Sequence, residues 1–187
     1  MNKTILVAVA ISILATLSCS HAVAQSRDHL TPQEADLVKD AQILDQRIDI
    51  FVKAADRRLM VITGSTASNA KQLKKDSGKW GELPAGSRAE LLADIAKILD
   101  EAITNIDDVS LRDEKNPLIP KALRKLAAEA TRIMEQLKPL YEQAKGDGEI
   151  ASFASLTENA ESILDAARKL PPPTEKTKAK KQEDNRK

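Results

Sequence analysis

The chain has very few of the side chains that carry most enzyme chemistry. Its 187 residues include one cysteine, Cys19, and two histidines, His21 and His29. Zinc sites of the usual His/Cys type, covalent haem attachment and di-iron Glu-x-x-His bundles need more of these residues than the chain supplies. We therefore predict no catalytic residue, no metal site and no cofactor, and we expect His29 to lie on a solvated segment.

Aromatic residues are also scarce and make up 2% of the chain. β-Sandwiches and β-barrels usually contain more aromatic and β-branched residues than this. Alanine, leucine, lysine, glutamate and aspartate dominate instead, which is typical of helical proteins. The composition therefore predicts an all-α fold.

Neither sign of charge prevails, because 29 basic residues balance 28 acidic ones and give a formal net charge of +1. Proteins that bind nucleic acid need a concentrated basic face. We therefore do not expect a nucleic-acid partner.

A long apolar run occurs only near the N-terminus, over residues 5–17. These 13 residues would rise about 20 Å as a helix, which is short of the roughly 30 Å hydrocarbon core of a bilayer. Lys3 precedes the run, and an Ala-Val-Ala sequence ending at Ala24 supplies the small residues that a signal peptidase requires. We predict that residues 1–24 are a signal peptide and that the protein is exported, periplasmic or secreted, without a stable membrane span.

A lipoprotein is the alternative within export. Cys19 follows a Thr-Leu-Ser sequence, which is a poor version of the small-residue box that precedes a lipidated cysteine. Cleavage near Ala24 would instead leave the mature protein without cysteine, and so without a disulfide in an oxidising compartment.

Four amphipathic helices are predicted after this segment, because apolar residues recur at intervals of three and four. Capping boxes open the first two helices at residues 31–34 and 87–90, while Pro117 and Gly146 mark the starts of the others. The predicted buried seams are, helix by helix, Leu37, Ala41, Leu44, Ile48, Val52, Ala55, Leu59 and Ile62; Leu92, Ile95, Leu99, Ala102, Ile106 and Val109; Leu123, Leu126, Ala130, Ile133, Leu137, Leu140 and Ala144; and Ile150, Phe153, Thr157, Ala160, Leu164 and Ala167.

The first of these helices is predicted to be the longest. Gly64 is its first stop signal, but Ala67, Ala70 and Leu73 favour continuation to about Lys75. Residues 76–86 contain three glycines and a proline and are predicted to form a loop.

The simplest way to bury four such stripes is an antiparallel up-down four-helix bundle with coiled-coil-like packing and one longer first helix. Residues 25–170 are predicted to form this single helical-bundle domain. Residues 171–187 are rich in proline and lysine and are predicted to be a disordered tail.

Trp80, with Lys74, Lys75 and Lys79 close to it in sequence, is the candidate interaction site. One interpretation is an exposed aromatic anchor in a basic rim, suited to a protein, a glycan or an anionic lipid. The other interpretation is structural, with the indole closing one end of the bundle and fixing the loop.

Three hypotheses of function follow. The first is an exported non-enzymatic bundle that acts through contacts with an unknown protein or envelope component, with homo-oligomerisation as one form of contact. The second is a periplasmic chaperone-like or ligand-sequestering protein. The third is an enzyme with an unrecognised carboxylate site, drawn from adjacent acids such as Asp107 and Asp108.

No close family is recognised. An export signal followed by a Leu-Thr-Pro-Gln sequence at residues 30–33 resembles small periplasmic helical chaperones and stress proteins. The capping box already accounts for these four residues, so no function is carried across from that resemblance.

Overall fold

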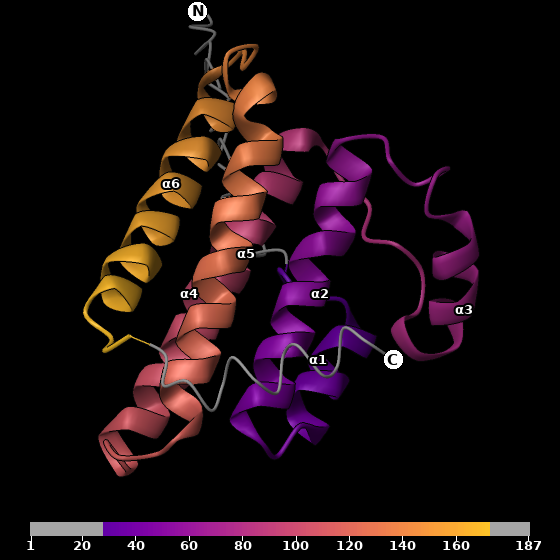
Figure 1. The fold of residues 1–187 in the computed structure, drawn as a ribbon. Helices are drawn as coiled ribbons and strands as arrows, with labels where there is room; N and C mark the ends of the chain where they lie inside the picture. Colours follow the sequence, from indigo (N-terminus) through magenta and orange to yellow (C-terminus); the bar gives the residue numbers. More distant parts are fainter. Residues whose placement is uncertain (1–27, 173–187) are drawn as a thin grey trace, which may run out of the picture.

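In the computed structural model, residues 28–172 are described, and this part of the chain contains six α-helices and no β-strand (Figure 1). The helices are α1 Pro32–Asp40, α2 Leu44–Ile62, α3 Ala70–Trp80, α4 Arg88–Arg112, α5 Leu118–Tyr141 and α6 Asp147–Arg168. The all-α prediction is confirmed, but the expected four helices are six. The predicted signal peptide, residues 1–24, and the predicted tail beyond residue 172 lie outside the described residues.

Both predicted capping boxes form. The hydroxyl of Thr31 accepts a hydrogen bond from the backbone N–H of Glu34 at 3.3 Å, and the Glu34 carboxylate accepts one from the backbone N–H of Thr31 at 2.9 Å. Ser87 and Glu90 repeat the arrangement at the start of α4. Each box satisfies backbone donors that a helix start otherwise leaves unpaired, so these two boundaries follow from local sequence.

The prediction of one continuous first helix is wrong, because the chain forms three helices, α1, α2 and α3, in this region. The first of the two breaks could not be predicted from the local sequence. The chain leaves the helix after α1 at Ala41, although neither glycine nor proline is present there. Arg47 donates from Nε and Nη2 to the backbone oxygen of Ala41, at 3.2 and 2.8 Å, and its Nη1 donates to Asn105 of α4 at 2.9 Å. The side chain of Arg47 therefore supplies donors for the Ala41 oxygen where the helix ends, and at the same time it joins this corner between α1 and α2 to α4.

The second break follows a local rule. The backbone N–H of Ser65 donates to the oxygen of Met60 and that of Gly64 to the oxygen of Val61, which is the Schellman arrangement. Gly64 has φ +68°, a conformation that favours glycine. The favoured continuation to Lys75 is thus wrong, and the predicted loop over residues 76–86 is partly helical because α3 extends to Trp80.

The helices do not all pack against antiparallel neighbours. Four ion pairs join α2 to α5. Three of them are between residues 76 positions apart: Asp45 with Lys121, Asp49 with Lys125 and Asp56 with Arg132. The fourth, Asp45 with Lys125, spans 80 positions. Two hydrogen bonds join α6 to α4 between residues 63 positions apart: Ser152 to Ala89 and Asn159 to Ala96. A constant offset means that both helices of a pair run in the same direction, so α2–α5 and α4–α6 are parallel.

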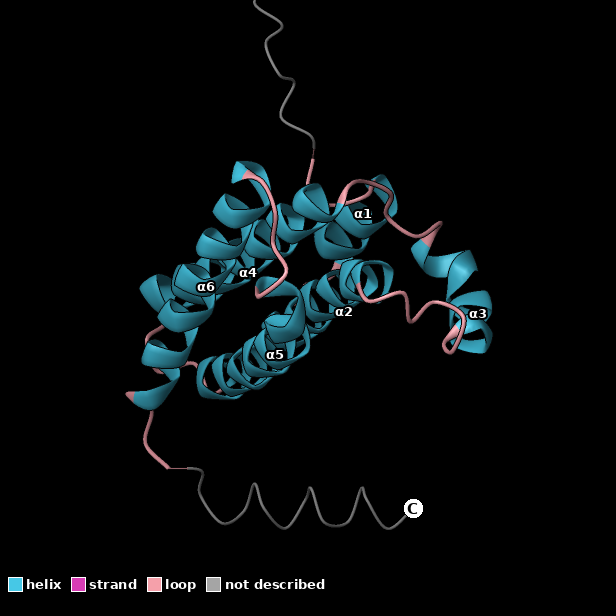
Figure 2. Ribbon diagram, turned by 90° about the horizontal axis from the view of Figure 1, so that it is seen from above, coloured by secondary structure: helices cyan, strands magenta, loops and turns pink. Residues whose placement is uncertain are grey.

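The neighbouring pairs α2–α4 and α5–α6 are antiparallel. From Arg47 to Arg58 along α2, the partners on α4 run backwards from Asn105 to Asp94. Tyr141 near the end of α5 contacts Phe153 near the start of α6. Figure 2 shows α2 and α6 on opposite sides with α4 and α5 between them, and no contact joins α2 to α6 within residues 28–172. The prediction of antiparallel neighbours therefore holds for α2–α4 and α5–α6 and is wrong for α2–α5 and α4–α6.

The core follows the predicted seams on α4 and α5, where Ile95 and Ile133 are fully buried. On α6 the seam is displaced. Its buried apolar residues are Phe153, Leu156, Ala160 and Ile163, whereas Ile150 is 52% exposed. α6 packs against both α4 and α5. The side of α6 that faces both helices is therefore buried, and this side differs from the one predicted from the spacing of apolar residues.

The start of α6 is fastened to the start of α4 by Arg88 and Glu149. The Glu149 carboxylate accepts from Nη2 of Arg88 and from the backbone N–H of Lys145, each at 3.0 Å. These bonds hold the pKa of Glu149 below its ordinary value of 4.5.

We expect this pair to make the fold sensitive to acid. A carboxyl group whose pKa is lower in the folded state than in the unfolded state stabilises the fold above its unfolded pKa, and this stabilisation is lost as the pH falls through the folded pKa. Urea denaturation between pH 6 and pH 2.5 should give a shallower loss of unfolding free energy below about pH 4.5 for Glu149→Gln than for the unchanged chain. Glu161→Gln, at an exposed position of the same helix, is the control. Equal slopes for all three proteins would contradict the prediction.

Candidate functional site

Four lysines form one exposed side of α3, which we call the α3 lysine face: Lys71, Lys74, Lys75 and Lys79. Their spacing of three, four and eight residues places them on neighbouring turns of the same side. None of them makes an ion pair with another of the described residues. The one acid of the helix, Asp76, is bound to Lys53 of α2 at 2.8 Å, and this hydrogen bond lowers its pKa. The lysine face therefore presents uncompensated positive charge.

Trp80, at the end of the same helix, does not share that exposure. Its side chain is 8% exposed, and the guanidinium carbon of Arg57 lies 5.8 Å from the centre of the indole. This placement corresponds to the structural interpretation of Trp80, a residue that covers part of the body. Lys74, Lys75 and Lys79 remain the accessible members of the candidate site, and their role in binding stays a prediction.

Beneath Trp80 lies a buried charge cluster made of Glu34, Arg57, Arg58 and Asp94, which are at most 4% exposed. Glu34 Oε1 accepts from Arg57 Nε and from Arg58 Nη1, both at 3.0 Å. Glu34 Oε2 lies 2.8 Å from Arg58 Nη2, and Asp94 of α4 lies 3.6 Å from Arg58 Nε. Two arginines thus meet two carboxylates from separate helices, and the formal charge of the cluster is zero.

Arg57 also fixes the end of α3. Its Nη2 donates to the backbone oxygen of Trp80 at 3.0 Å and to that of Glu82. The chain turns at Gly81, which has φ +64° and whose position for a Cβ atom lies 3.0 Å from the side chain of Gln33. A substituted residue would meet both an unfavourable backbone conformation and α1. The cluster and this turn therefore set the position from which α3 leaves the body.

This cluster was not predicted from the sequence, because Glu34 and Arg57 were expected to lie on one continuous helix. Across 23 residues a helix rises about 35 Å, yet Glu34 and Arg57 are in contact. The available signal was two adjacent arginines, Arg57 and Arg58, between the apolar residues Ala55 and Leu59. Charges within an apolar stripe are buried only when they are paired.

His29 is another correction, because it does not lie free in solvent. Its Nε2 is 2.6 Å from Oε2 of Glu101 on α4, and its side chain is 24% exposed. This contact brings the segment before α1 onto the body, next to the charge cluster, where the backbone oxygen of His29 accepts from Arg58.

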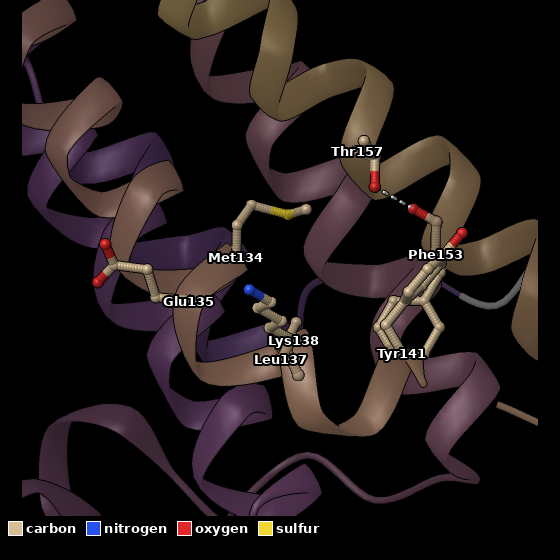
Figure 3. A pocket seen from close by; sticks show the side chains of 7 residues that line it. All are labelled: Met134, Glu135, Leu137, Lys138, Tyr141, Phe153 and Thr157. Atoms are coloured by element: carbon tan, nitrogen blue, oxygen red, sulfur yellow. Dashed lines mark hydrogen bonds between the residues drawn. The ribbon is translucent and has the colours of Figure 1, made fainter. Parts of the chain in front are cut away.

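A second feature is an apolar groove between α5 and α6, with a volume of about 440 Å³. Figure 3 shows the side chains that line it: Met134, Glu135, Leu137, Lys138, Tyr141, Phe153 and Thr157. The rings of Tyr141 and Phe153 meet edge to face with centroids 5.3 Å apart. Tyr141 is 58% exposed, so the groove opens to the surface.

A third depression, between α2, α3 and α5, is polar, and its charged groups are engaged with one another. Arg132 bridges Asp56 and Glu129, and Lys53 binds Asp76. Burial raises the pKa of Glu129 to about 7. Since these side chains already have partners, this depression offers a ligand less than the lysine face or the groove.

Within residues 28–172, no group of three histidine, cysteine, aspartate or glutamate side chains could hold a metal ion. In the same range, no helix combines the length and apolar character that a bilayer span requires. No protein-family model, no curated protein and no solved structure matches the chain.

Proposed function

We propose that this protein is an exported, non-enzymatic helical protein that attaches to an anionic phospholipid surface of the cell envelope through the α3 lysine face. Export rests on the predicted signal peptide, residues 1–24. In this proposal α2, α4, α5 and α6 act as one four-helix bundle, within a single domain of residues 25–170, and α1 and α3 are additions to it.

The observation that carries the proposal is a separation of charge. α3 holds four lysines and one aspartate, a net charge of +3, whereas residues 25–170 as a whole hold 22 basic and 25 acidic residues, a net charge of −3. Figure 1 shows α3 set apart from the other helices. An acidic body should be repelled by an anionic surface, so the molecule would approach with α3 first.

The mode of attachment follows from which side chains of α3 are exposed. Trp80 is buried and Leu73 is half-buried, so the helix has no large apolar side chain to insert between lipids. Attachment would then be electrostatic, at about 1 kcal/mol for each lysine near an anionic surface, and salt should weaken it. The buried charge cluster supports this role because it fixes the end of α3.

Binding to vesicles tests the proposal. The purified protein is sedimented with vesicles of phosphatidylglycerol and phosphatidylcholine, and with phosphatidylcholine alone, at low ionic strength. Replacing Lys74, Lys75 and Lys79 with glutamine should weaken binding to the anionic vesicles roughly 100-fold, because three contributions of about 1 kcal/mol are removed. High salt should have a similar effect on the unchanged chain.

The control carries the same change of charge elsewhere. Lys97, Lys115 and Lys169 are exposed on other parts of the molecule, and their replacement with glutamine should change binding much less. If both triple variants lose binding equally, net charge rather than the α3 lysine face is responsible. If the unchanged chain does not bind anionic vesicles, the proposal is wrong.

A further inference from the structure

The apolar groove between α5 and α6 is a second, separate feature of the molecule. Its floor is made by Leu137 and Phe153, which are almost fully buried, and its sides by Met134, Tyr141 and Thr157 (Figure 3). Its volume of about 440 Å³ lies within the range of roughly 300–1,000 Å³ that small-molecule sites occupy. The hollow therefore has the size of a site for a small ligand.

The hydroxyl that Thr157 adds to the groove already has a hydrogen-bond partner. The hydroxyl of Thr157 already donates to the backbone oxygen of Phe153 at 2.9 Å. Met134 contributes a flexible, polarisable side chain, which adapts to ligands of irregular shape. Such a lining favours a hydrocarbon chain over a polar solute, because a polar group placed there would lose its hydrogen bonds with water.

Two charged side chains, Glu135 and Lys138, belong to the lining of this apolar surface. Figure 3 shows both charged groups on the side opposite the rings of Tyr141 and Phe153, with the ammonium group of Lys138 between the rings and the carboxylate of Glu135. Lys138 makes no ion pair with another of the described residues. A ligand lying along the groove would therefore meet a positive group at its end.

We propose that this groove binds a single-chain amphiphile with an anionic head group. The hydrocarbon chain lies against Leu137 and Phe153, and the carboxylate or phosphate head pairs with Lys138. This site is independent of the α3 lysine face, because the groove is formed by α5 and α6 alone.

Calorimetric titration with decanoate, below the concentration at which it forms micelles, tests the proposal with the purified full chain. We expect saturable binding of one decanoate per chain. Decanol should bind more weakly, and decyltrimethylammonium should bind more weakly still, because Lys138 attracts an anion and repels a cation. Equal affinity for all three ligands would overturn the assignment of the head group.

Two variants locate the site. Thr157→Phe places a ring into the groove and should abolish decanoate binding while leaving the thermal unfolding temperature within a few degrees. Lys138→Gln should weaken decanoate binding roughly three- to tenfold and leave decanol binding unchanged, as expected for one partly solvated ion pair. Lys145→Gln, an exposed lysine outside the groove lining, is the matched control and should bind decanoate normally.

The remaining outcomes each decide against the proposal. If replacement of Lys74, Lys75 and Lys79 removes decanoate binding while Lys138→Gln does not, the anion binds on α3 and the groove is not its site. If decanoate does not bind and Thr157→Phe changes the sedimentation of the chain with concentration, the groove is instead a contact for a second copy.

Discussion

Glu34→Gln is expected to lower the unfolding free energy by about 3–5 kcal/mol, the cost of breaking a buried ion pair by removing one partner. The Glu34 carboxylate is fully buried between Arg57 and Arg58. A glutamine there would still fit, but Asp94 would be the only acid left in the cluster. For a domain stabilised by about 5–15 kcal/mol, this is a large fraction of the total.

Glu90→Gln is a closely matched control for this variant. Glu34 and Glu90 occupy the same position of two capping boxes, and glutamine can replace glutamate in either box. Glu90 is exposed, so Glu90→Gln should cost less than about 1 kcal/mol. Urea denaturation of both variants isolates the effect of the buried charges, and equal losses would show that the cluster does not contribute to stability.

The fluorescence of Trp80 provides an independent measurement, because it is the only tryptophan in the chain. The buried indole should emit at short wavelength and be quenched weakly by acrylamide in the unchanged protein. In Glu34→Gln, Arg57 loses its carboxylate and the turn at residues 80–82 should loosen. The emission should then shift to longer wavelength before the helices unfold.

The second large effect is expected in the core. Ile95→Asp should destabilise the protein by about 4 kcal/mol or more, because it removes a fully buried side chain and buries an unpaired charge. If this variant does not fold, Ile95→Ala should still show a loss of about 2–5 kcal/mol.

Ile150→Asp applies the same substitution at an exposed position. Ile150 lies in the first turn of α6, where a negative charge is favourable, so the change should stay within about 0.5 kcal/mol. Thermal unfolding followed by circular dichroism measures both variants. A comparable loss at positions 95 and 150 would mean that the core is not arranged as described.

The difference between these two isoleucines shows how far the sequence could predict the core. Periodicity identifies the apolar side of a helix, but it does not say how many neighbours that side will have. On α4 the predicted seam through Ile95 is buried as expected. On α6, which packs against two helices, the buried line includes Leu156 and Ile163 and leaves Ile150 outside.

The candidate sites divide in the same way. Lys74, Lys75 and Lys79 could be singled out from the sequence because they are close together in the chain. The groove could not, since Tyr141 and Phe153 belong to different helices and each reads as an ordinary apolar position. The charge cluster was missed because Glu34 and Arg57 are distant in sequence.

Four features could be predicted from the amino-acid sequence alone: the helical class, the two capped helix starts, the candidate boundary at Gly64, and the burial of Ile95 and Ile133. These features depend on groups a few residues apart, whose geometry is set by the helix repeat. Three other features are set by the packing of the helices: the break after α1, the parallel arrangement of α2 with α5 and of α4 with α6, and the burial of Trp80. Each of these depends on contacts between distant residues, such as Arg47 with Asn105 and Arg57 with Glu34. Local propensity carries no information about such pairs, because their energy exists only once the helices have come together.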